Sequence, residues 1–281
     1  MPRLAANTSL MYTEFAFMQR FAAAAADGFE AVEFLFPYAF VAADIAAQLR
    51  QHGLQQALLN APPGGVDAAT VASAWDSGMR GTACLPGRET EFQSGVLLAL
   101  DYAVQLGCPR IHLMAGIVPA GIAPAQLRQT YVANLRWAAQ QAANLGCTVL
   151  IEPINPMDMP GYYLNNQATA HAVCAEVNRP NCKVQMDLYH CAKVEGDIRS
   201  MLEQYLPSGN VAHLQIAGVP GRHEPDHLSN PGAALWPELL ALIDTLGYTG
   251  WVGCEYRPRA GTTAGLGWAQ PWLKTGGHNG Q

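Results

Sequence analysis

The chain has 281 residues, of which 50% are hydrophobic and 14% are charged, a composition that can fill an apolar core and excludes a disordered protein. Sixteen Lys and Arg against 22 Asp and Glu give a formal charge of −6, and no basic cluster occurs, so we expect no nucleic-acid partner. No apolar run reaches the roughly 18 residues of a membrane span, and the first residues lack a signal-peptide pattern. We therefore expect a globular protein with no membrane partner, located in the cytoplasm.

The seven cysteines are scattered along the chain, and none of them forms a C-x-x-C pair. An odd number of cysteines without this spacing fits neither a disulfide framework nor a structural zinc site. We expect reduced thiols that pack as small hydrophobic side chains.

Eight short apolar runs, each of the length of a buried strand, recur along the chain. They cover residues 4–9, 31–36, 54–61, 110–116, 148–153, 183–189, 211–218 and 251–256. Between these runs lie Ala- and Leu-rich segments with the residue spacing of helices. The helical segments cover residues 14–27, 41–53, 90–107, 125–146, 166–178, 197–206 and 234–247.

The alternation of strands and helices with short links predicts parallel strands joined by crossover helices. Four helical segments end on a glycine that would cap the helix before the next strand, namely Gly53, Gly107, Gly146 and Gly247. Eight such units favour an α/β fold of the (β/α)8 TIM barrel type over a doubly wound sheet, because no G-x-G-x-x-G follows the first strand. We expect one barrel domain over residues 1–281, with a lid or substrate loop at 62–90 and a mobile tail at about 274–281.

Polar side chains stand where four consecutive predicted strands end. The fifth strand ends at Glu152, the sixth at Asp187, the seventh at Gln215 and the eighth at Glu255. In a (β/α)8 barrel these strand ends form the active site. Carboxylates crowded there would repel one another unless a cation lay among them, and oxygen ligands without thiolates select Mg²⁺ or Mn²⁺. We therefore predict that the four residues bind a divalent metal ion, although each alone could be a hydrogen-bond acceptor in a loop.

Two further polar residues follow the sixth and seventh strands. His190 is either a substrate contact or a solvated loop histidine, and Arg222 either pairs with a substrate carboxylate or is an exposed loop arginine. Glu33 and His112 lie on predicted strands, and we expect them in hydrogen-bond networks of the barrel interior. Asp197 precedes a helical run and is expected to cap it.

Several segments resemble the hydroxypyruvate isomerase family, within the xylose isomerase-like barrel superfamily. The most specific are "FLFPY", "IAGVPGRHEPD" and "GCEY", and the similarity covers nearly the whole chain. The chain departs from the family after "RHEPD", where the family usually continues with Gly-Glu and then Asn, whereas residues 227–229 here are His-Leu-Ser. These residues are expected to border the site, so the difference affects which substrate the site would accept.

The resemblance implies an aldose–ketose type isomerisation of a small hydroxy-oxo acid, in the founding case hydroxypyruvate to tartronate semialdehyde through a metal-stabilised enediolate. It implies Glu152 and Glu255 as the acid/base pair and as metal ligands together with Asp187 and Gln215. It also implies that His190 and Arg222 contact the substrate. One glutamate would remove a C–H proton next to the polarised carbonyl, and the same or the other glutamate would return a proton to the adjacent carbon.

Several alternatives stay open. A 2-oxo-tetronate isomerase or a ketose 3-epimerase would use the same metal site, and a substrate without a carboxylate would make Arg222 dispensable. A non-catalytic barrel that binds a sugar or an acid would need only one of the two glutamates. A phosphodiesterase of the endonuclease IV type would need more histidine ligands and a basic surface. Assembly into a homo-oligomer is left open, since many barrel enzymes form dimers or tetramers.

Overall fold

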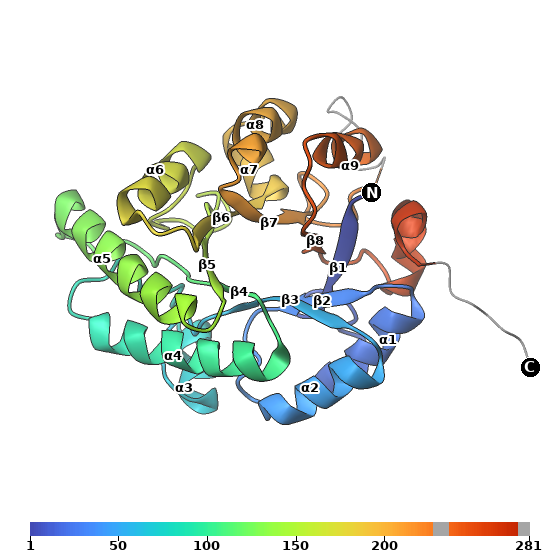
Figure 1. Ribbon diagram of the computed structural model, residues 1–281, viewed down its shortest axis with the longest axis horizontal. Helices are drawn as coiled ribbons and strands as arrows, with labels where there is room; N and C mark the ends of the chain where they lie inside the picture. The colour runs from blue at the N-terminus through green and yellow to red at the C-terminus, as the bar shows by residue number, and fades with distance from the viewer. Residues whose placement is uncertain (227–235, 275–281) are drawn as a thin grey trace, which may run out of the picture.

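Eight parallel strands form a closed barrel in the order in which they occur along the chain (Figure 1). The computed structural model describes residues 1–226 and 236–274. The strands are β1 (Arg3–Asn7), β2 (Ala31–Phe34), β3 (Gln55–Asn60), β4 (Arg110–His112), β5 (Thr148–Ile151), β6 (Cys182–Asp187), β7 (Val211–Ile216) and β8 (Trp251–Cys254). The prediction of a (β/α)8 barrel with these eight strands is confirmed, and most strands end two to four residues earlier than predicted.

Helices surround the barrel on its outside, as Figure 1 shows. They are α1 (Arg20–Ala26), α2 (Ala42–Gln51), α3 (Ala68–Asp76), α4 (Glu89–Leu106), α5 (Pro124–Ala143), α6 (Gln167–Val177), α7 (Leu188–Val194), α8 (Ile198–Tyr205) and α9 (Trp236–Thr245), with the 3-10 helices η1 (Phe17–Gln19), η2 (Leu206–Ser208) and η3 (Thr263–Trp272). Among the described residues, no helix has both the length and the apolarity that crossing a bilayer would require.

Local sequence accounts for several helix boundaries. Gly107 caps α4 in the left-handed conformation, with φ of 62°, which a residue with a Cβ adopts only at a cost. The side chain of Asp197 accepts a hydrogen bond from the backbone N–H of Ser200, so its prediction as a helix cap is confirmed. All seven cysteines are free and buried, in agreement with their expected role as small hydrophobic residues.

Two of the α-helices, α3 and α7, were not predicted from the sequence. Helix α3 lies inside the segment 62–90, where Asp67 and Thr70 form a reciprocal capping box; the role of this segment as a lid stays a prediction. Helix α7 starts directly after Asp187, within a run that reads as the continuation of a strand. The residues 227–229 that depart from the family pattern, and the tail from 275 onwards, lie outside the described residues.

A buried carboxylate, Glu33 on β2, organises the polar part of the barrel interior. It accepts hydrogen bonds from Asn7 Nδ2 at 2.9 Å and Gln215 Nε2 at 2.7 Å, and its Oε2 lies 2.6 Å from His213 Nε2. The expectation that Glu33 belongs to an interior network is therefore confirmed. Because burying a polar group is costly unless it is hydrogen-bonded, these three partners allow Glu33 to lie inside the barrel.

The space for the Glu33 carboxylate depends on the absence of a side chain on β8. A Cβ added at Gly253 would clash with both carboxylate oxygens and the carboxyl carbon of Glu33. We expect Gly253→Ala to lower the free energy of unfolding by about 1–3 kcal/mol, the usual cost of overpacking a core. Urea denaturation followed by circular dichroism measures this difference.

Gly267→Ala is the matched control, because a Cβ there would meet no atom of the described residues within 4 Å. The same loss of stability in both variants would show that the effect does not come from Glu33.

Candidate active site

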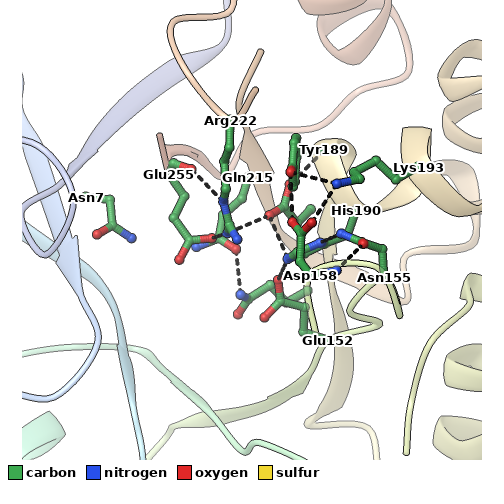
Figure 2. Close-up of polar contacts among 12 residues, drawn as sticks. Asn7, Glu152, Asn155, Asp158, Tyr189, His190, Lys193, Gln215, Arg222 and Glu255 are labelled. Atoms are coloured by element: carbon green, nitrogen blue, oxygen red, sulfur yellow. Dashed lines mark hydrogen bonds and ion pairs between the residues drawn. The ribbon is translucent and has the colours of Figure 1, made fainter. Parts of the chain in front are cut away.

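Three buried carboxylates lie at the C-terminal ends of the strands, and Figure 2 shows two of them, Glu152 and Glu255. Glu152 directly follows β5, Asp187 is the last residue of β6, and Glu255 directly follows β8. Burial raises the pKa of Glu152 well above its usual range, and the charges of Glu255 and Asp187 raise it further. Burial also raises the pKa of Glu255 and of Asp187, although the charge of Arg222 opposes both shifts. A group of acids that resist ionisation is suited to proton transfer near neutral pH.

Arg222 is the cation that the structure places against two of these carboxylates. Its Nη2 lies 2.7 Å from Glu255 Oε2 and 3.5 Å from Asp187 Oδ2. The backbone of Arg222 has a φ of 55°, in the left-handed region that a residue with a long side chain rarely adopts. Its backbone N–H donates to Gly218 O and its carbonyl accepts from Arg257 N–H, which holds this conformation. The guanidinium is thus fixed at the site, which excludes the reading of Arg222 as a free loop arginine.

His190 lies on the first turn of α7 and is buried, so its alternative reading as a solvated loop histidine is wrong. Its Nδ1 lies 2.6 Å from Asn155 Nδ2. The amide oxygen of Asn155 already accepts hydrogen bonds from the backbone N–H groups of Met157 and Asp158, so the amide NH2 faces the ring (Figure 2). Nδ1 of His190 is therefore an acceptor, and the proton of the neutral ring lies on Nε2.

The Nε2 atom of His190 faces the carboxylates. It lies 3.6 Å from Asp187 Oδ2 and 3.8 Å from Glu152 Oε1. Burial lowers the pKa of His190 well below its usual range, and the nearby charge of Arg222 lowers it further, so the ring is neutral. A neutral ring with its proton on Nε2 can donate one hydrogen bond to an oxygen atom bound among these groups.

A second group of polar contacts connects the loop after β5 to helix α7. Tyr189 donates a hydrogen bond from its hydroxyl to Asp158 Oδ2 at 2.7 Å, and Lys193 Nζ donates to Asp158 Oδ1 at 2.6 Å (Figure 2). The Arg222 guanidinium lies over the ring of Tyr189, with 5.1 Å from Cζ to the ring centroid. Tyr189, Asp158, Lys193 and Asn155 were not predicted from the sequence as residues of the site. The Asn three positions after Glu152 in "EPIN" is a signal that could have been used.

Gln215 is oriented from the barrel interior. Its Nε2 donates to Glu33 Oε1, and its Oε1 accepts from Gln185 Nε2 at 2.6 Å. Because the amide nitrogen of Gln215 donates to Glu33, its amide oxygen points away from Glu33 and towards Gln185. An oxygen held in this way is a suitable ligand for a hard cation.

His112, the last residue of β4, differs from the expectation of an interior network. It is buried, but neither ring nitrogen makes a hydrogen bond to any described residue. Its Nε2 lies 3.7 Å from Glu152 Oε2, which is beyond hydrogen-bond distance.

The donors at the site suit a divalent metal ion. One oxygen each of Glu152 and Asp187 and one ring nitrogen of His190 lie within 4.8 Å of one another. Because Nδ1 of His190 accepts from Asn155 and Nε2 carries the proton, the two carboxylates are the atoms of this group that can bind the ion. Glu152 Oε1 is buried without a hydrogen bond from the described part of the chain, as expected of an atom that binds an exogenous group. Of the four predicted ligands, the structure brings Glu152 and Asp187 together, while Glu255 pairs with Arg222 and Gln215 with Gln185. The set of four stays a prediction.

Sequence comparisons connect this site to known proteins. A family model described as "xylose isomerase-like TIM barrel" matches residues 21–275. The chain is 55% identical over 273 residues to a 2-oxo-tetronate isomerase of Cupriavidus necator, an alignment that covers 97% of this chain and 99% of that protein. It is 39% identical over 272 residues to a hydroxypyruvate isomerase of Escherichia coli, with 97% and 100% covered.

Two solved structures show how similar the backbones are. A Brucella melitensis protein described as an AP endonuclease of family 2 matches with a TM-score of 0.90 and 45% identity, over 98% of this chain and 100% of that chain. A D-psicose 3-epimerase from Clostridium cellulolyticum H10 matches with a TM-score of 0.70 and 18% identity, over 95% of this chain and 89% of that chain. The second similarity is evidence for the fold alone.

Ion binding at the carboxylates can be measured by thermal unfolding. We expect Mn²⁺ or Mg²⁺ to raise the melting temperature, since a ligand at a hundred times its Kd stabilises the folded state by about 2.7 kcal/mol. Asp187→Asn is expected to abolish this rise because it removes a charged ligand from the group. Asp101→Asn is the control, because Asp101 is an exposed residue of α4 whose side chain accepts a hydrogen bond from Gln105 away from the site. An equal rise in wild type and Asp187→Asn would place the ion elsewhere.

Proposed function

Because the chain belongs to the xylose isomerase-like TIM barrel family and is an isomerase, we propose that it interconverts a 2-oxo-3-hydroxy acid and the isomeric 3-oxo-2-hydroxy acid. The preferred substrate in this proposal is a four-carbon 2-oxo-tetronate, with the three-carbon hydroxypyruvate second. The 55% identity to a 2-oxo-tetronate isomerase, against 39% to a hydroxypyruvate isomerase, is the reason for placing the four-carbon acid first.

The observation that carries the proposal is a pair of buried glutamates with raised pKa values, Glu152 directly after β5 and Glu255 directly after β8. Such groups accept and return protons near neutral pH. One of them takes the proton from C3 of the substrate to form an enediolate, and the same or the other glutamate delivers a proton to C2. The hydroxyl proton moves from the C3 oxygen to the C2 oxygen, so the reaction needs no oxidant or reductant.

The other residues of the site bind and orient the acid. Arg222 offers a planar guanidinium for the substrate carboxylate, from a position already fixed beside Glu255. His190 donates its Nε2–H to a substrate oxygen. A divalent ion held by Glu152 and Asp187, with Gln215 and Glu255 as the further predicted ligands, supplies a Lewis acid that polarises the carbonyl when bound.

Three other functions have less support. A ketose epimerase would have no carboxylate for Arg222, and the epimerase structures share only the fold with this chain. A non-catalytic barrel does not account for two buried glutamates with raised pKa values. An endonuclease activity, the function in the name of the Brucella protein, is disfavoured by the formal charge of −6, since nucleic-acid binding depends on basic residues.

The proton-transfer roles can be tested in D₂O. Wild type should exchange the C3 proton of the substrate for deuterium, as seen by NMR, and each of Glu152→Gln and Glu255→Gln should slow isomerisation by about 10²–10⁴-fold, the usual contribution of a general acid or base. Circular dichroism checks that both variants are folded. If both variants isomerise as fast as wild type, the glutamates are not the acid/base groups.

The role of Arg222 predicts an effect on binding. Arg222→Gln should raise KM for the acid by about 10- to 100-fold, because a hydrogen bond to a charged group contributes about 1.5–3 kcal/mol. Arg128→Gln removes an arginine that pairs with Glu176 away from the site and should leave KM unchanged. A KM for Arg222→Gln within twofold of wild type would contradict carboxylate binding by this residue.

A further inference from the structure

His112 is the buried polar residue of the site to which the proposed reaction assigns no task. Its side chain is 1% exposed, and neither ring nitrogen makes a hydrogen bond to the described residues. Leaving a buried polar group without a hydrogen bond costs about 1–3 kcal/mol. Other buried side chains of the described residues, such as Gln167, also lack a partner, and what distinguishes His112 is its place beside Glu152 at the barrel mouth. Such an imidazole points to a ligand.

The surroundings of His112 place that ligand at the barrel mouth. In the β4–β5 pair His112 is aligned with Leu150 of β5. Glu152 follows two residues later, directly after the end of that strand. His112 Nε2 lies 3.7 Å from Glu152 Oε2, and Glu152 Oε1 also lacks a hydrogen bond from the described part of the chain. Two buried groups with free hydrogen-bonding capacity therefore stand side by side.

The chemistry of His112 suits a hydroxyl group. Burial lowers the pKa of His112 to about 3, and the charge of His213 lowers it further, so the ring is neutral. A neutral imidazole has one N–H donor and one acceptor nitrogen, and a hydroxyl can likewise donate and accept. A carboxylate would be a poorer partner, because an ionised carboxylate only accepts hydrogen bonds and so could use only the N–H of the ring.

The barrel order decides which substrate hydroxyl this is. In a closed barrel of eight strands in sequence order, β4 lies opposite β8. Arg222 follows β7 and pairs with Glu255, which directly follows β8. An acid whose carboxylate binds Arg222 thus extends towards β4, with C2 and C3 between Glu255 and Glu152. The next atom beyond C3, in a four-carbon acid only, is C4 with its hydroxyl group.

We propose that His112 binds the C4 hydroxyl of a four-carbon 2-oxo acid and thereby sets the preference for this acid over hydroxypyruvate, which ends at C3. This inference rests on the proposed function and adds the residue that determines chain length. It makes His112 a substrate contact and assigns it no proton transfer.

The test compares two substrates in variants of one residue. His112→Leu removes the proposed hydrogen bonds to the C4 hydroxyl. The specificity ratio, kcat/KM for 2-oxo-tetronate divided by kcat/KM for hydroxypyruvate, should fall by about 10- to 100-fold, because the site then no longer distinguishes the acid that carries this hydroxyl. The value for hydroxypyruvate alone should change less than about threefold. His112→Gln keeps an N–H donor at a similar reach, and its ratio should lie nearer to that of wild type.

Folding of the variants is checked by thermal unfolding. His112→Leu replaces a buried group without hydrogen bonds by an apolar one, so its melting temperature should equal or exceed that of wild type. If this variant does not fold, His112→Phe, which keeps a planar ring without nitrogen, takes its place in the same comparison. Equal losses on both acids, or no change on either, would overturn the proposal.

Binding of unreactive acids separates this inference from the proposed reaction. Tetronate and glycerate are four- and three-carbon hydroxy acids without an oxo group, and calorimetry gives their Kd values for wild type and His112→Leu. The substitution should weaken tetronate binding about tenfold or more and leave glycerate binding unchanged. If wild type isomerises neither oxo acid, the proposed function fails. The role of His112 is still decided by whether His112→Leu weakens the binding of tetronate more than that of glycerate.

Discussion

The repulsion among three buried carboxylates is the constraint on which the site depends. Parallel strands of one barrel end at the same edge, so Glu152, Asp187 and Glu255 are brought together, and burial raises the pKa of each. Arg222 offsets part of the repulsion by lying between Asp187 and Glu255, in a left-handed backbone conformation held by hydrogen bonds from neighbouring loops. Glu152 keeps an oxygen without a hydrogen bond from the described residues, which suits both ion binding and proton transfer.

Two polar connections hold the loop after β5 against helix α7. Asn155 orients His190 through its amide NH2, and Asp158 binds Tyr189 and Lys193. Because α7 starts directly after Asp187, these contacts hold a carboxylate and a histidine of the site in one rigid arrangement. The proton on Nε2 of the histidine, and with it the ability to donate to a substrate, follows from the Asx turn that Asn155 forms with the loop backbone.

The interior of the barrel contributes to the site as well as to stability. Glu33 is kept buried by Asn7, His213 and Gln215, and the same hydrogen bond that stabilises this carboxylate directs the oxygen of Gln215 away from it. His112 shows the opposite pattern, since its nitrogens make no hydrogen bond within the described ranges although it is buried. Glu33 is thus held by three partners, whereas His112 and Glu152 Oε1, which stand beside each other at the barrel mouth, have no hydrogen bond from the described residues.

The sequence by itself determined the eight strands, the barrel and the position of Glu152, Asp187 and Glu255 at its mouth. Residue periodicity and the alternation of strands with helices over short links are both visible in the order of residues along the chain. The sequence did not predict α7, since its first residues continue the apolar run of β6, nor the contacts of Asn155 and Asp158, which lie in a loop rich in turn residues. Only the tertiary structure decided which cation faces which carboxylate, and that His112 makes no hydrogen bond to the described residues. Those outcomes depend on side chains from different strands, and packing rather than sequence spacing sets their directions.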